Sequence, residues 1–508
     1  MEKIQNLKNL ANKLNKFKKK GKKIILCHGV FDVLHIGHVK HFESAKKMGD
    51  ILVVSVTPDK FVKKGPNRPI FPLNLRMQSL ASLQVIDYVV PNTSDTAVYP
   101  ILNLKPHIYC KGKDYSNIKL DHSGNIIKEI NAIKKVKGSI NFTNDILFSS
   151  SKIINESNLN LTKSQSDFLY SIKKDKLIKE NDVPRLINSF KDLKVLVIGE
   201  TIIDEYVYCD PLGKSAKEPV LAVKYLKSKK IIGGTMSIAK NLSSFCKKVT
   251  VLSYIGEKSE QIKFIKKNLA KNIFPIFLKK KNSCTIIKKR YVDQVSRSKI
   301  LGVYSIEDQL INKKEEKILS NIILNQIPKH DLVIVSDYGH GFINDKIAKL
   351  ILKKSNYLSV NAQINASNIG FHTISKYKNA DLVIINENEM RHEMRDKSSQ
   401  LNELIKRLGK KINTKLLTVT SGNQGSKTFN KKTKKLHSCP AFAHKVVDKI
   451  GAGDTMLAIL SLAVFKKIDI RLGMFFSALA ASINIQSEAN SMLLDKSEII
   501  KSIQSYLK

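Results

Sequence analysis

The chain has 508 residues, of which 42% are hydrophobic, so it is long enough for more than one domain with a buried core. Its formal net charge is +43, but only nine of the 87 basic residues are arginines and the lysines are spread along the whole chain. A nucleic-acid-binding protein would more often cluster this charge among aromatic side chains, which here make up 7%, so we expect no nucleic-acid partner.

The six cysteines are scattered and form no C-x-x-C pair. This argues against a zinc site or a disulfide framework and favours a reducing, cytoplasmic location. No apolar run approaches the roughly 18 residues that a membrane-spanning helix needs, so we expect no membrane span. Apolar residues at helical spacing between residues 4 and 17 predict a helix that packs on the first domain.

The first informative stretch is residues 27–41, with the sequence Cys-His-Gly-Val-Phe-Asp-Val-Leu-His-Ile-Gly-His-Val-Lys-His. The apolar run 23–27 predicts a buried parallel strand, and the run 51–56 predicts the next one. Residues 37–47 between them have helical character. The stretch is therefore a strand-to-helix turn in an α/β unit.

Two histidines lie at this turn. His35 and His38 are three residues apart, so they share one face of the starting helix. Free backbone N–H groups and the positive end of the helix dipole attract anions there, and Gly29 and Gly37 let a phosphate approach the backbone. Histidines satisfied in a core or on the surface are the alternative, but two at this spacing after Gly-x-Phe-Asp favour a phosphate site.

Further polar residues follow in the first half. Lys64 and Arg68 lie in a Gly- and Pro-rich loop, and Arg76 follows in a helical stretch. Cations near an anion site can clamp a triphosphate, although each alone is more often a solvated surface charge. Lys111 closes an expected strand at 107–110. Three hydroxyls, which could cap a helix or bind a second phosphate, belong to Ser149, Ser150 and Ser151.

The second half alternates strands with helices from residue 194 onward, which predicts an α/β fold with a mostly parallel sheet and ligands at the carboxyl ends of its strands. Asp204 lies near one such end, where it could bind sugar hydroxyls or lie on the surface. Adjacent glycines at 233–234 permit a hinge or a close ligand approach. An N-x-x-E arrangement at 386–389 suits water-mediated Mg²⁺ binding, and residues 420–425 form a Gly-rich turn after another strand.

The strongest motif of the second half is Gly-Ala-Gly-Asp at residues 451–454, which opens an apolar helix. Gly451 and Gly453 free backbone amides for an anion hole, and Asp454 beside them could accept the proton of an attacking hydroxyl. A helix N-cap aspartate after a flexible turn is the alternative. No Walker A sequence occurs, so a P-loop kinase is excluded.

Residues 22–155 resemble the adenylyltransferase half of the bifunctional heptose-7-phosphate kinase/heptose-1-phosphate adenylyltransferase family, a cytidylyltransferase-like nucleotidyltransferase. The shared elements are His-x-Gly-His, Lys-Gly-Pro-x-Arg-Pro, Cys-Lys-Gly-Lys-Asp-Tyr and Ser-Ser-Ser. The resemblance implies attack of a sugar-phosphate oxygen on a nucleotide α-phosphate, with His35 and His38 catalytic. It implies nucleotide contacts for Gly29, Phe31, Asp32, Gly37, Lys64, Arg68, Lys111, Ser149, Ser150 and Ser151.

Residues 190–505 resemble the ribokinase/PfkB sugar kinases, and most of all the kinase half of the same heptose family. The resemblance implies that Asp454 is the catalytic base, with Gly451, Ala452 and Gly453 as the anion hole. It implies a Mg²⁺ site, held through water, at Asn386 and Glu389. It further implies ATP contacts for Thr420, Gly422 and Gly425, and sugar contacts for Asp204, Gly233 and Gly234.

Several positions depart from that family. The two halves stand in the opposite order, with the transferase first. Ser237 replaces a sugar-side asparagine, Asn361 replaces the aspartate of a Val-Asp-Pro-Lys segment, and Glu200 replaces the aspartate that follows the first strand. These changes lie on the sugar side or near the phosphates and leave the Gly-Ala-Gly-Asp motif intact.

We therefore expect an N-terminal Rossmann-like nucleotidyltransferase domain (1–158), a linker (159–182) and a C-terminal ribokinase-like α/β domain with a small β lid (183–508). The expected function is nucleotide-sugar synthesis from sugar phosphates with ATP and Mg²⁺, leading by resemblance to an ADP-heptose-like product. A separate phosphatase would act between the two steps. The alternative is a transferase that activates another polyol or sugar phosphate with CTP or ATP. In that case the kinase half would be degenerate and would act as a binding or regulatory module. A homodimer is compatible with either.

Overall fold

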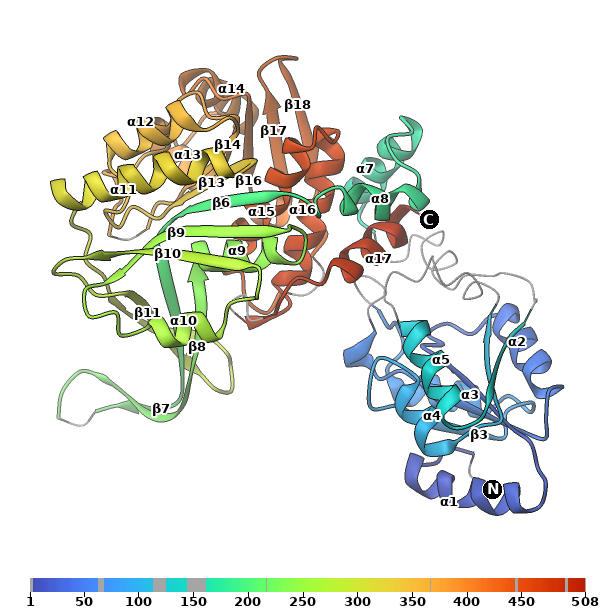
Figure 1. Ribbon diagram of the computed structural model, residues 1–508. Coiled ribbons are helices and arrows are strands. Elements are labelled where there is room, and N and C mark those ends of the chain that lie inside the picture. The colour runs from blue at the N-terminus through green and yellow to red at the C-terminus, as the bar shows by residue number, and fades with distance from the viewer. Residues whose placement is uncertain are drawn as a thin grey trace. The chain divides into compact units, whose positions relative to one another are not determined.

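The computed structural model describes residues 3–62, 68–112, 125–143, 161–215, 217–365, 367–443, 446–488 and 492–507. The chain forms two compact units, residues 1–161 with 500–508, and residues 162–499, each built around its own sheets (Figure 1). The expected domain limits at 158 and 183 stay a prediction.

The first unit is an α/β layer structure around a five-stranded parallel sheet with the order β3-β2-β1-β4-β5. Its strands are β1 (Ile24–Gly29), β2 (Ile51–Val56), β3 (Tyr88–Pro91), β4 (Ile108–Gly112) and β5 (Ser139–Thr143). Its helices are α1 (Leu7–Lys19), α2 (Ile36–Lys46), α3 (Leu73–Ala81), α4 (Val98–Leu104) and α5 (Asn125–Lys135), with a 3-10 turn η1 (Asp59–Phe61).

The apolar runs of β1 and β2 are buried almost throughout, as expected for parallel strands covered on both faces. Ile24 and Leu26 belong to the apolar cluster on one face, which also holds Leu10 and Leu14 of the expected N-terminal helix. Ile25 and other alternate residues of β1 pack in a second cluster on the opposite face. The strand order reverses between β1 and β4, which is where ligands bind in open parallel sheets.

The second unit has a nine-stranded sheet with the order β10-β9-β6-β13-β14-β15-β16-β17-β18, parallel as far as β16. A separate four-stranded sheet, β12-β11-β7-β8, corresponds to the expected small lid. The strands are β6 (Lys194–Gly199), β7 (Thr201–Lys214), β8 (Leu221–Gly234), β9 (Lys248–Gly256), β10 (Ile273–Lys280), β11 (Ile286–Asp293), β12 (Lys299–Ser305), β13 (Leu332–Asp337), β14 (Leu358–Ala362), β15 (Leu382–Asn386), β16 (Leu416–Thr420), β17 (Ser426–Asn430) and β18 (Lys435–Cys439).

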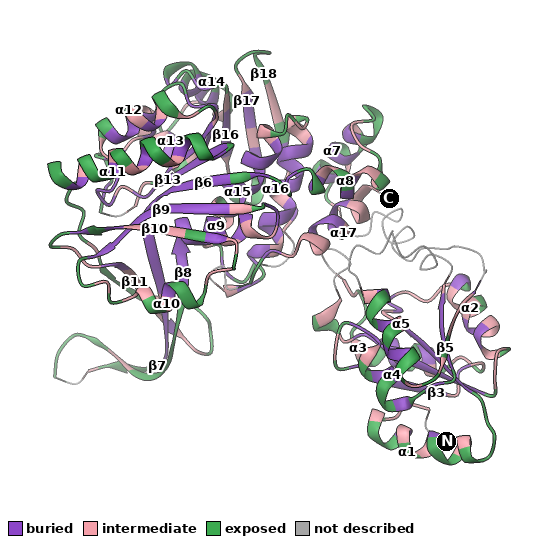
Figure 2. Cartoon of the chain, viewed as in Figure 1, coloured by how far each residue is buried: buried purple, intermediate pink, exposed green. Residues whose placement is uncertain are grey.

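Helices cover both faces of the large sheet, and the buried layers stand out in Figure 2. One apolar cluster joins the sheet to α11 (Lys313–Gln326), α12 (Asp345–Lys354), α13 (Glu387–Met394) and α14 (Leu401–Lys411). The other face carries α9 (Thr235–Ser243), α15 (Ala452–Phe465) and α16 (Ile470–Asn484). The remaining elements are α7 (Lys163–Lys174), α8 (Val183–Asn188), α10 (Ile262–Lys267), α17 (Lys496–Leu507) and the 3-10 turns η4 (Glu180–Asp182), η5 (Ile327–Lys329), η6 (Ile374–Tyr377) and η7 (Gly422–Gln424).

Helix α7 lies in the segment that we expected to be a linker. It begins with a capping box between Thr162 and Gln165, and Gln165 also donates a hydrogen bond of 2.6 Å to the carbonyl oxygen of Ala441. The ring of Phe168 packs against those of Phe442 and Phe475, with centroids 6.2 and 6.0 Å away. These contacts attach α7 to the second unit.

Candidate active sites

The Gly-Ala-Gly-Asp motif forms the start of α15. Gly451 is the N-cap residue and has a φ of +87°, a conformation that favours glycine. The hydroxyl of Thr455 donates a hydrogen bond of 2.9 Å to the carbonyl oxygen of Gly451 and accepts one of 3.0 Å from the side chain of Asn241. The fold thus fixes the turn that presents the first backbone amides of the helix.

Asp454 lies in the first turn of α15. Its Oδ1 accepts a hydrogen bond of 3.0 Å from the hydroxyl of Tyr338, which follows β13. Burial raises the pKa of Asp454 to about 6, and the negative charge of Asp204 adds to this, while Tyr338 and Lys288 act in the opposite direction. A half-buried carboxylate with this pKa is suited to accept a proton near neutral pH.

The segment that carries Tyr338 is held by Glu200, the residue that replaces the family's aspartate. The fully buried carboxylate of Glu200 accepts hydrogen bonds from the backbone N–H groups of Tyr338, at 2.9 Å, and His340, at 3.1 Å. Burial, followed by the nearby Asp337, raises the pKa of Glu200 to about 7. Glu200 therefore positions the group that contacts Asp454.

The expected sugar-side residues meet at the lid. Asp204 on β7 forms an ion pair with Arg290 on β11. A Cβ on Gly233 would lie 2.3 Å from Oδ2 of Asp204, and Gly234 has a φ of +59° with no room toward the carbonyl oxygen of Glu200. Gly233 therefore fits the close approach of the Asp204 side chain, and Gly234 is required by its positive φ and by the nearby backbone of Glu200.

Lys288 is a cation near Asp454 that the sequence reasoning missed. Its ammonium lies 6.0 Å from the ring centroids of both Tyr304 and Tyr338. Burial lowers the pKa of Lys288, whereas Asp204 raises it, and Arg290 lies two residues further along the same face of β11. Among 87 basic residues, nothing in the local sequence distinguishes these two side chains.

The N-x-x-E pair at the end of β15 forms a capping box at the start of α13. The backbone N–H of Glu389 donates to the side chain of Asn386, and the N–H of Asn386 donates to the carboxylate of Glu389, both at 2.9 Å. Burial raises the pKa of Glu389 to about 7, and Asp454 adds to the shift. The side-chain oxygens of both residues already accept hydrogen bonds from the backbone. These oxygens therefore suit a Mg²⁺ ion that is bound through water better than one that is coordinated directly.

The Gly-rich turn after β16 contains two glycines with different needs. Gly422 has a φ of +56° and open space around its Cβ position, whereas a Cβ on Gly425 would lie 2.1 Å from the carbonyl oxygen of Cys439. Thr420 ends β16, and the hydroxyl of Ser421 donates to Glu387 at 2.8 Å. Gly425 is thus needed for packing, while Gly422 leaves the turn open to a ligand.

The remaining departures from the family are accommodated within the fold. Ser237 is buried in the first turn of α9. Asn361 on β14 donates a hydrogen bond of 2.9 Å from its side chain to the carbonyl oxygen of Ile384.

In the first unit, the two histidines lie where β1 leads into α2. His35 is the N-cap residue of α2, and its ring stacks on that of His38 with centroids 3.9 Å apart. Phe31, which has a φ of +50°, packs edge-on against His38 at 5.5 Å. A Cβ on Gly29 would lie 2.8 Å from the ring of Phe31, and Gly37 is buried in the first turn of α2.

Asp32 anchors the loop before α3. It accepts hydrogen bonds from the backbone N–H groups of Ile70 and Phe71, at 2.9 and 3.0 Å, and Nη1 of Arg68 lies 3.5 Å from its Oδ2. The Arg68 side chain is only 4% exposed, so it is held beside the site rather than free in solvent.

Arg76 does not have the role of a phosphate-binding cation that the sequence suggested. Its buried guanidinium donates to the carbonyl oxygens of Phe71, Val30 and Thr57 and to the carboxylate of Asp59. These contacts tie together the loops after β1 and β2. Arg76 is therefore a structural clamp in this conformation.

Lys111 lies at the carboxyl end of β4, beside β1. Its Nζ is 3.3 Å from Oε2 of Glu129, which also accepts a hydrogen bond of 2.9 Å from the hydroxyl of Tyr109. Burial lowers the pKa of the neighbouring His28 to about 4, and the charge of Lys111 adds to this. Four expected nucleotide contacts lie outside the described residues: Lys64, Ser149, Ser150 and Ser151.

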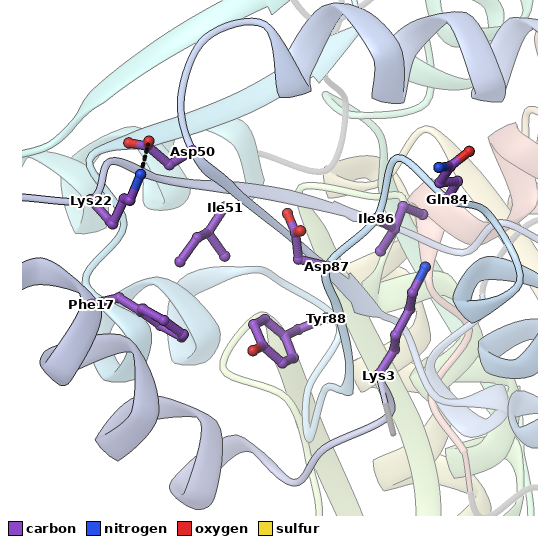
Figure 3. A pocket seen from close by; sticks show the side chains of 9 residues that line it. All are labelled: Lys3, Phe17, Lys22, Asp50, Ile51, Gln84, Ile86, Asp87 and Tyr88. Carbon is purple, nitrogen blue, oxygen red and sulfur yellow. Dashed lines mark hydrogen bonds and ion pairs between the residues drawn. The ribbon is translucent and has the colours of Figure 1, made fainter. Parts of the chain in front are cut away.

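A cavity of about 430 Å³ opens at the other edge of the same sheet (Figure 3). Its lining includes Ile51 at the start of β2 and Tyr88 at the start of β3, together with Phe17 of α1. Because the histidines follow the carboxyl end of β1, this cavity is not part of their site.

The two sites and their sheets define a sugar-kinase-like unit and a nucleotidyltransferase-like unit. Residues 192–495 match the model for the pfkB family carbohydrate kinases, and residues 26–156 match the Cytidylyltransferase-like model. Because the first match covers more than half of the chain, the protein belongs to the pfkB family of carbohydrate kinases. The matches confirm the expected fold of each half and the order of the two domains.

Curated relatives include the "Bifunctional protein HldE" of Campylobacter jejuni strain RM1221, 29% identical over 289 residues, which are 54% of this chain and 58% of the relative. The protein of the same name from a Nitratiruptor species is 28% identical over 302 residues, 57% of this chain and 61% of the relative. The chain thus spans about three fifths of the length of these relatives.

Among solved structures, the phosphofructokinase-2 from Escherichia coli in complex with potassium aligns with a TM-score of 0.51 at 13% identity, over 62% of this chain and 99% of that one. This likeness supports the fold of the second unit. Across the described parts of the chain, no helix combines the length and apolar character needed to cross a bilayer.

Proposed function

We propose that the chain is a bifunctional enzyme of nucleotide-sugar synthesis. Its C-terminal unit would phosphorylate a sugar phosphate with ATP, and its N-terminal unit would couple a sugar 1-phosphate to a nucleotide. The observation that carries the proposal is the position of Asp454 at the glycine-lined start of α15, with its carboxylate held by Tyr338.

In the proposed kinase reaction, Asp454 accepts the proton of a sugar hydroxyl as the hydroxyl oxygen attacks the γ-phosphorus of ATP. The bond from that phosphorus to the bridging oxygen breaks and ADP leaves. Backbone amides from Gly451 to Gly453 face the transferring group, where a helix start stabilises negative charge. A Mg²⁺ ion held through water near Asn386 and Glu389 would neutralise phosphate charge.

Two cations near Asp454 support a phosphorylated substrate. The ammonium of Lys288 lies 6.0 Å from the ring centroids of Tyr304 and Tyr338, and within the described residues no carboxylate lies within ion-pair distance of it. Arg290, paired with Asp204, borders the same space. Hydroxyls could therefore bind at Asp204 while a phosphate binds near Lys288. Heptose 7-phosphate is the leading candidate because of the family resemblance described above.

The proposed transferase reaction takes place where β1, β2 and β4 end. An oxygen of the sugar 1-phosphate attacks the α-phosphorus of the nucleotide, and pyrophosphate leaves. His35 and His38 would stabilise the developing charge. Arg68, paired with Asp32, and Lys111, at the end of β4, are the cations proposed to bind the phosphates. ATP is the proposed nucleotide, and the experiment below compares it with CTP. A separate phosphatase would act between a bisphosphate product and the 1-phosphate substrate.

The test is product analysis of the full chain with ATP, Mg²⁺ and a panel of free sugars and sugar phosphates, including heptose 7-phosphate. Wild type and Asp454→Asn are compared. ADP formation that requires both Asp454 and one sugar phosphate is expected. Pyrophosphate release from a sugar 1-phosphate is measured separately with ATP and with CTP.

The result that would reject the kinase proposal is the absence of sugar-dependent ADP while pyrophosphate release persists. That outcome would favour the alternative, a transferase with a degenerate kinase half. All six cysteines are free thiols, which supports the cytoplasm as the proposed compartment.

A further inference from the structure

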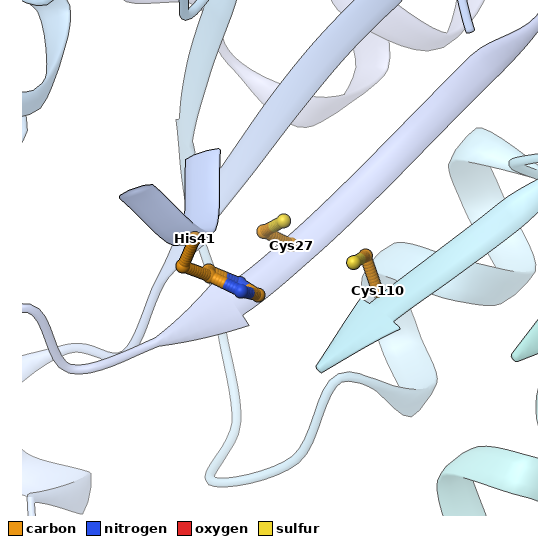
Figure 4. A group of neighbouring side chains, drawn as sticks. All are labelled: Cys27, His41 and Cys110. Atoms are coloured by element: carbon orange, nitrogen blue, oxygen red, sulfur yellow. The ribbon is translucent and has the colours of Figure 1, made fainter. Parts of the chain in front are cut away.

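Three potential metal ligands meet in the first unit although they are far apart in the sequence. Cys27 lies on β1, Cys110 on β4 and His41 on α2, and their ligand atoms all lie within 4.8 Å of one another. Figure 4 shows the imidazole of His41 directed toward the two cysteines. Cys27 and Cys110 are register partners on adjacent strands, so their side chains point to the same face of the sheet.

The donor set is that of a thiophilic cation. Zinc binds cysteine sulfur at about 2.3 Å and histidine nitrogen at about 2.0 Å, so tetrahedral ligands lie about 3.3–3.8 Å apart. Side-chain shifts of about 1 Å would bring the three ligand atoms to that spacing. Two thiolates balance the charge of a divalent ion, which removes most of the cost of burying it. Water or another oxygen would complete the tetrahedron.

The surroundings hold the ligands in place. Cys27 and Cys110 are buried, and the half-buried His41 has its Nδ1 2.8 Å from Oγ1 of Thr143 on β5. Such outer contacts orient the imidazole in metal sites. Soft thiolate ligands favour Zn²⁺ over the hard cation Mg²⁺, and binding of the metal displaces the thiol protons.

We propose that Cys27, His41 and Cys110 form a Zn²⁺ site that fastens α2 to β1 and β4. Binding releases the two thiol protons and forms two zinc–sulfur bonds and one zinc–nitrogen bond. His38 lies one helical turn before His41, so the ion would fix the helix that carries the expected catalytic pair. This proposal departs from the sequence analysis, which argued against a zinc site because no C-x-x-C pair occurs. The usual zinc spacings are local, whereas these ligands come from three separate elements.

The experiment uses the full chain, purified with a reductant, stripped with a chelator and titrated with Co²⁺ as a spectroscopic probe for zinc. One equivalent should produce the thiolate-to-cobalt charge-transfer band and the visible bands of tetrahedral cobalt. Excess Zn²⁺ should abolish both. Metal analysis after gel filtration should find one zinc per chain.

Cys110→Ser and His41→Gln should each weaken binding at least tenfold, whereas the matched control Cys284→Ser, in the other unit, should leave it unchanged. His41→Gln replaces a partly exposed side chain, so it tests the site even if Cys110→Ser fails to fold. The proposal is overturned if wild type shows no sulfur-to-cobalt band, or if both variants retain it.

Discussion

The hydroxyl of Tyr338 donates a hydrogen bond of 3.0 Å to Oδ1 of Asp454, and this contact joins the end of β13 to the start of α15. Tyr338 is in turn fixed through its backbone N–H, which donates to the buried carboxylate of Glu200. A continuous set of contacts therefore runs from the first strand of the second unit to the proposed base. Its consequences can be measured in the pH dependence of the kinase.

The first prediction concerns Tyr338→Phe. Asp454 must be unprotonated to act as a base and has a pKa of about 6, so kcat/KM should fall as the pH drops below about 6. The hydrogen bond from Tyr338 lowers that pKa, so its loss should move the acidic limb to higher pH. A bond worth about 1.5 kcal/mol corresponds to about one pH unit. The measurement is the pH profile of ADP formation.

A matched control is Tyr170→Phe, which removes the hydroxyl of an exposed tyrosine on α7 and should leave the profile unchanged. If Tyr338→Phe loses activity equally at every pH, the hydroxyl does not act on the ionisation of Asp454.

The second prediction concerns substrate choice and Lys288→Met. Methionine keeps most of the length of the side chain but removes its charge, so a substrate phosphate would lose a charge-assisted contact. KM for the sugar phosphate should rise by roughly 10–100-fold, corresponding to about 1.4–2.8 kcal/mol, while KM for ATP stays within about twofold. Steady-state kinetics with each substrate varied in turn measures the two constants. If KM rises equally for ATP and for the sugar phosphate, Lys288 does not bind the phosphate group of the sugar.

Much of the fold follows from local sequence patterns. Continuous apolar runs predicted β1 and β2, because parallel strands covered on both faces leave no room for polar alternation. Two glycines of the motifs also have structural reasons, since Gly451 has a φ of +87° and Gly233 lies in tight contact with the side chain of Asp204. These features depend on a few adjacent residues.

The residues that sequence reasoning missed depend on distant contacts. Lys288 and Arg290 reach the site because β11 pairs with β7, more than 80 residues away in the chain. The role of Arg76 as a clamp follows from three loops that only the fold brings together. The Cys27, His41 and Cys110 cluster likewise arises from the pairing of β1 with β4. Local spacing contains none of this information.

The third prediction separates a structural role of Glu389 from its proposed role near Mg²⁺. Glutamine also serves at this position of a capping box, so Glu389→Gln should preserve the start of α13. The folded-state pKa is raised to about 7, so the group's contribution to stability is present at low pH and is lost as the pH rises from about 4.5 through 7. The variant should therefore gain about 1–3 kcal/mol relative to wild type between pH 5 and pH 8.

Denaturant unfolding at the two pH values measures that gain, and a Mg²⁺ titration of kinase activity measures the other role. We expect a higher Mg²⁺ requirement in Glu389→Gln. Glu403→Gln, an exposed change in α14, should alter neither quantity. If the Mg²⁺ dependence of kinase activity is unchanged in Glu389→Gln, Asn386 and Glu389 serve only as a capping box.

The fourth prediction is that Gly453→Ala stabilises the fold but impairs the kinase. Beyond its chain neighbours and the helix's own backbone, no atom lies within 4 Å of the position that its Cβ would take, and alanine favours a helix over glycine by about 1 kcal/mol. The same methyl group would project where the transferred phosphoryl group should approach the amides of α15. We expect unchanged or higher resistance to denaturant with at least a tenfold loss in kcat/KM for ATP. Full activity in a stable variant would exclude this face of the helix as the anion hole.

The last prediction distinguishes a clamp from a phosphate ligand at Arg76. Lysine keeps the positive charge but cannot reproduce a planar guanidinium that donates to three backbone carbonyls and Asp59. Arg76→Lys should therefore destabilise the first unit by about 2–4 kcal/mol. Hydrogen exchange should show faster opening of β1 and β2 with β13 unchanged. Arg185→Lys, at an exposed arginine of α8, is the matched control. If Arg76→Lys instead preserves protection but weakens nucleotide binding, its guanidinium must leave these carbonyls to bind phosphate.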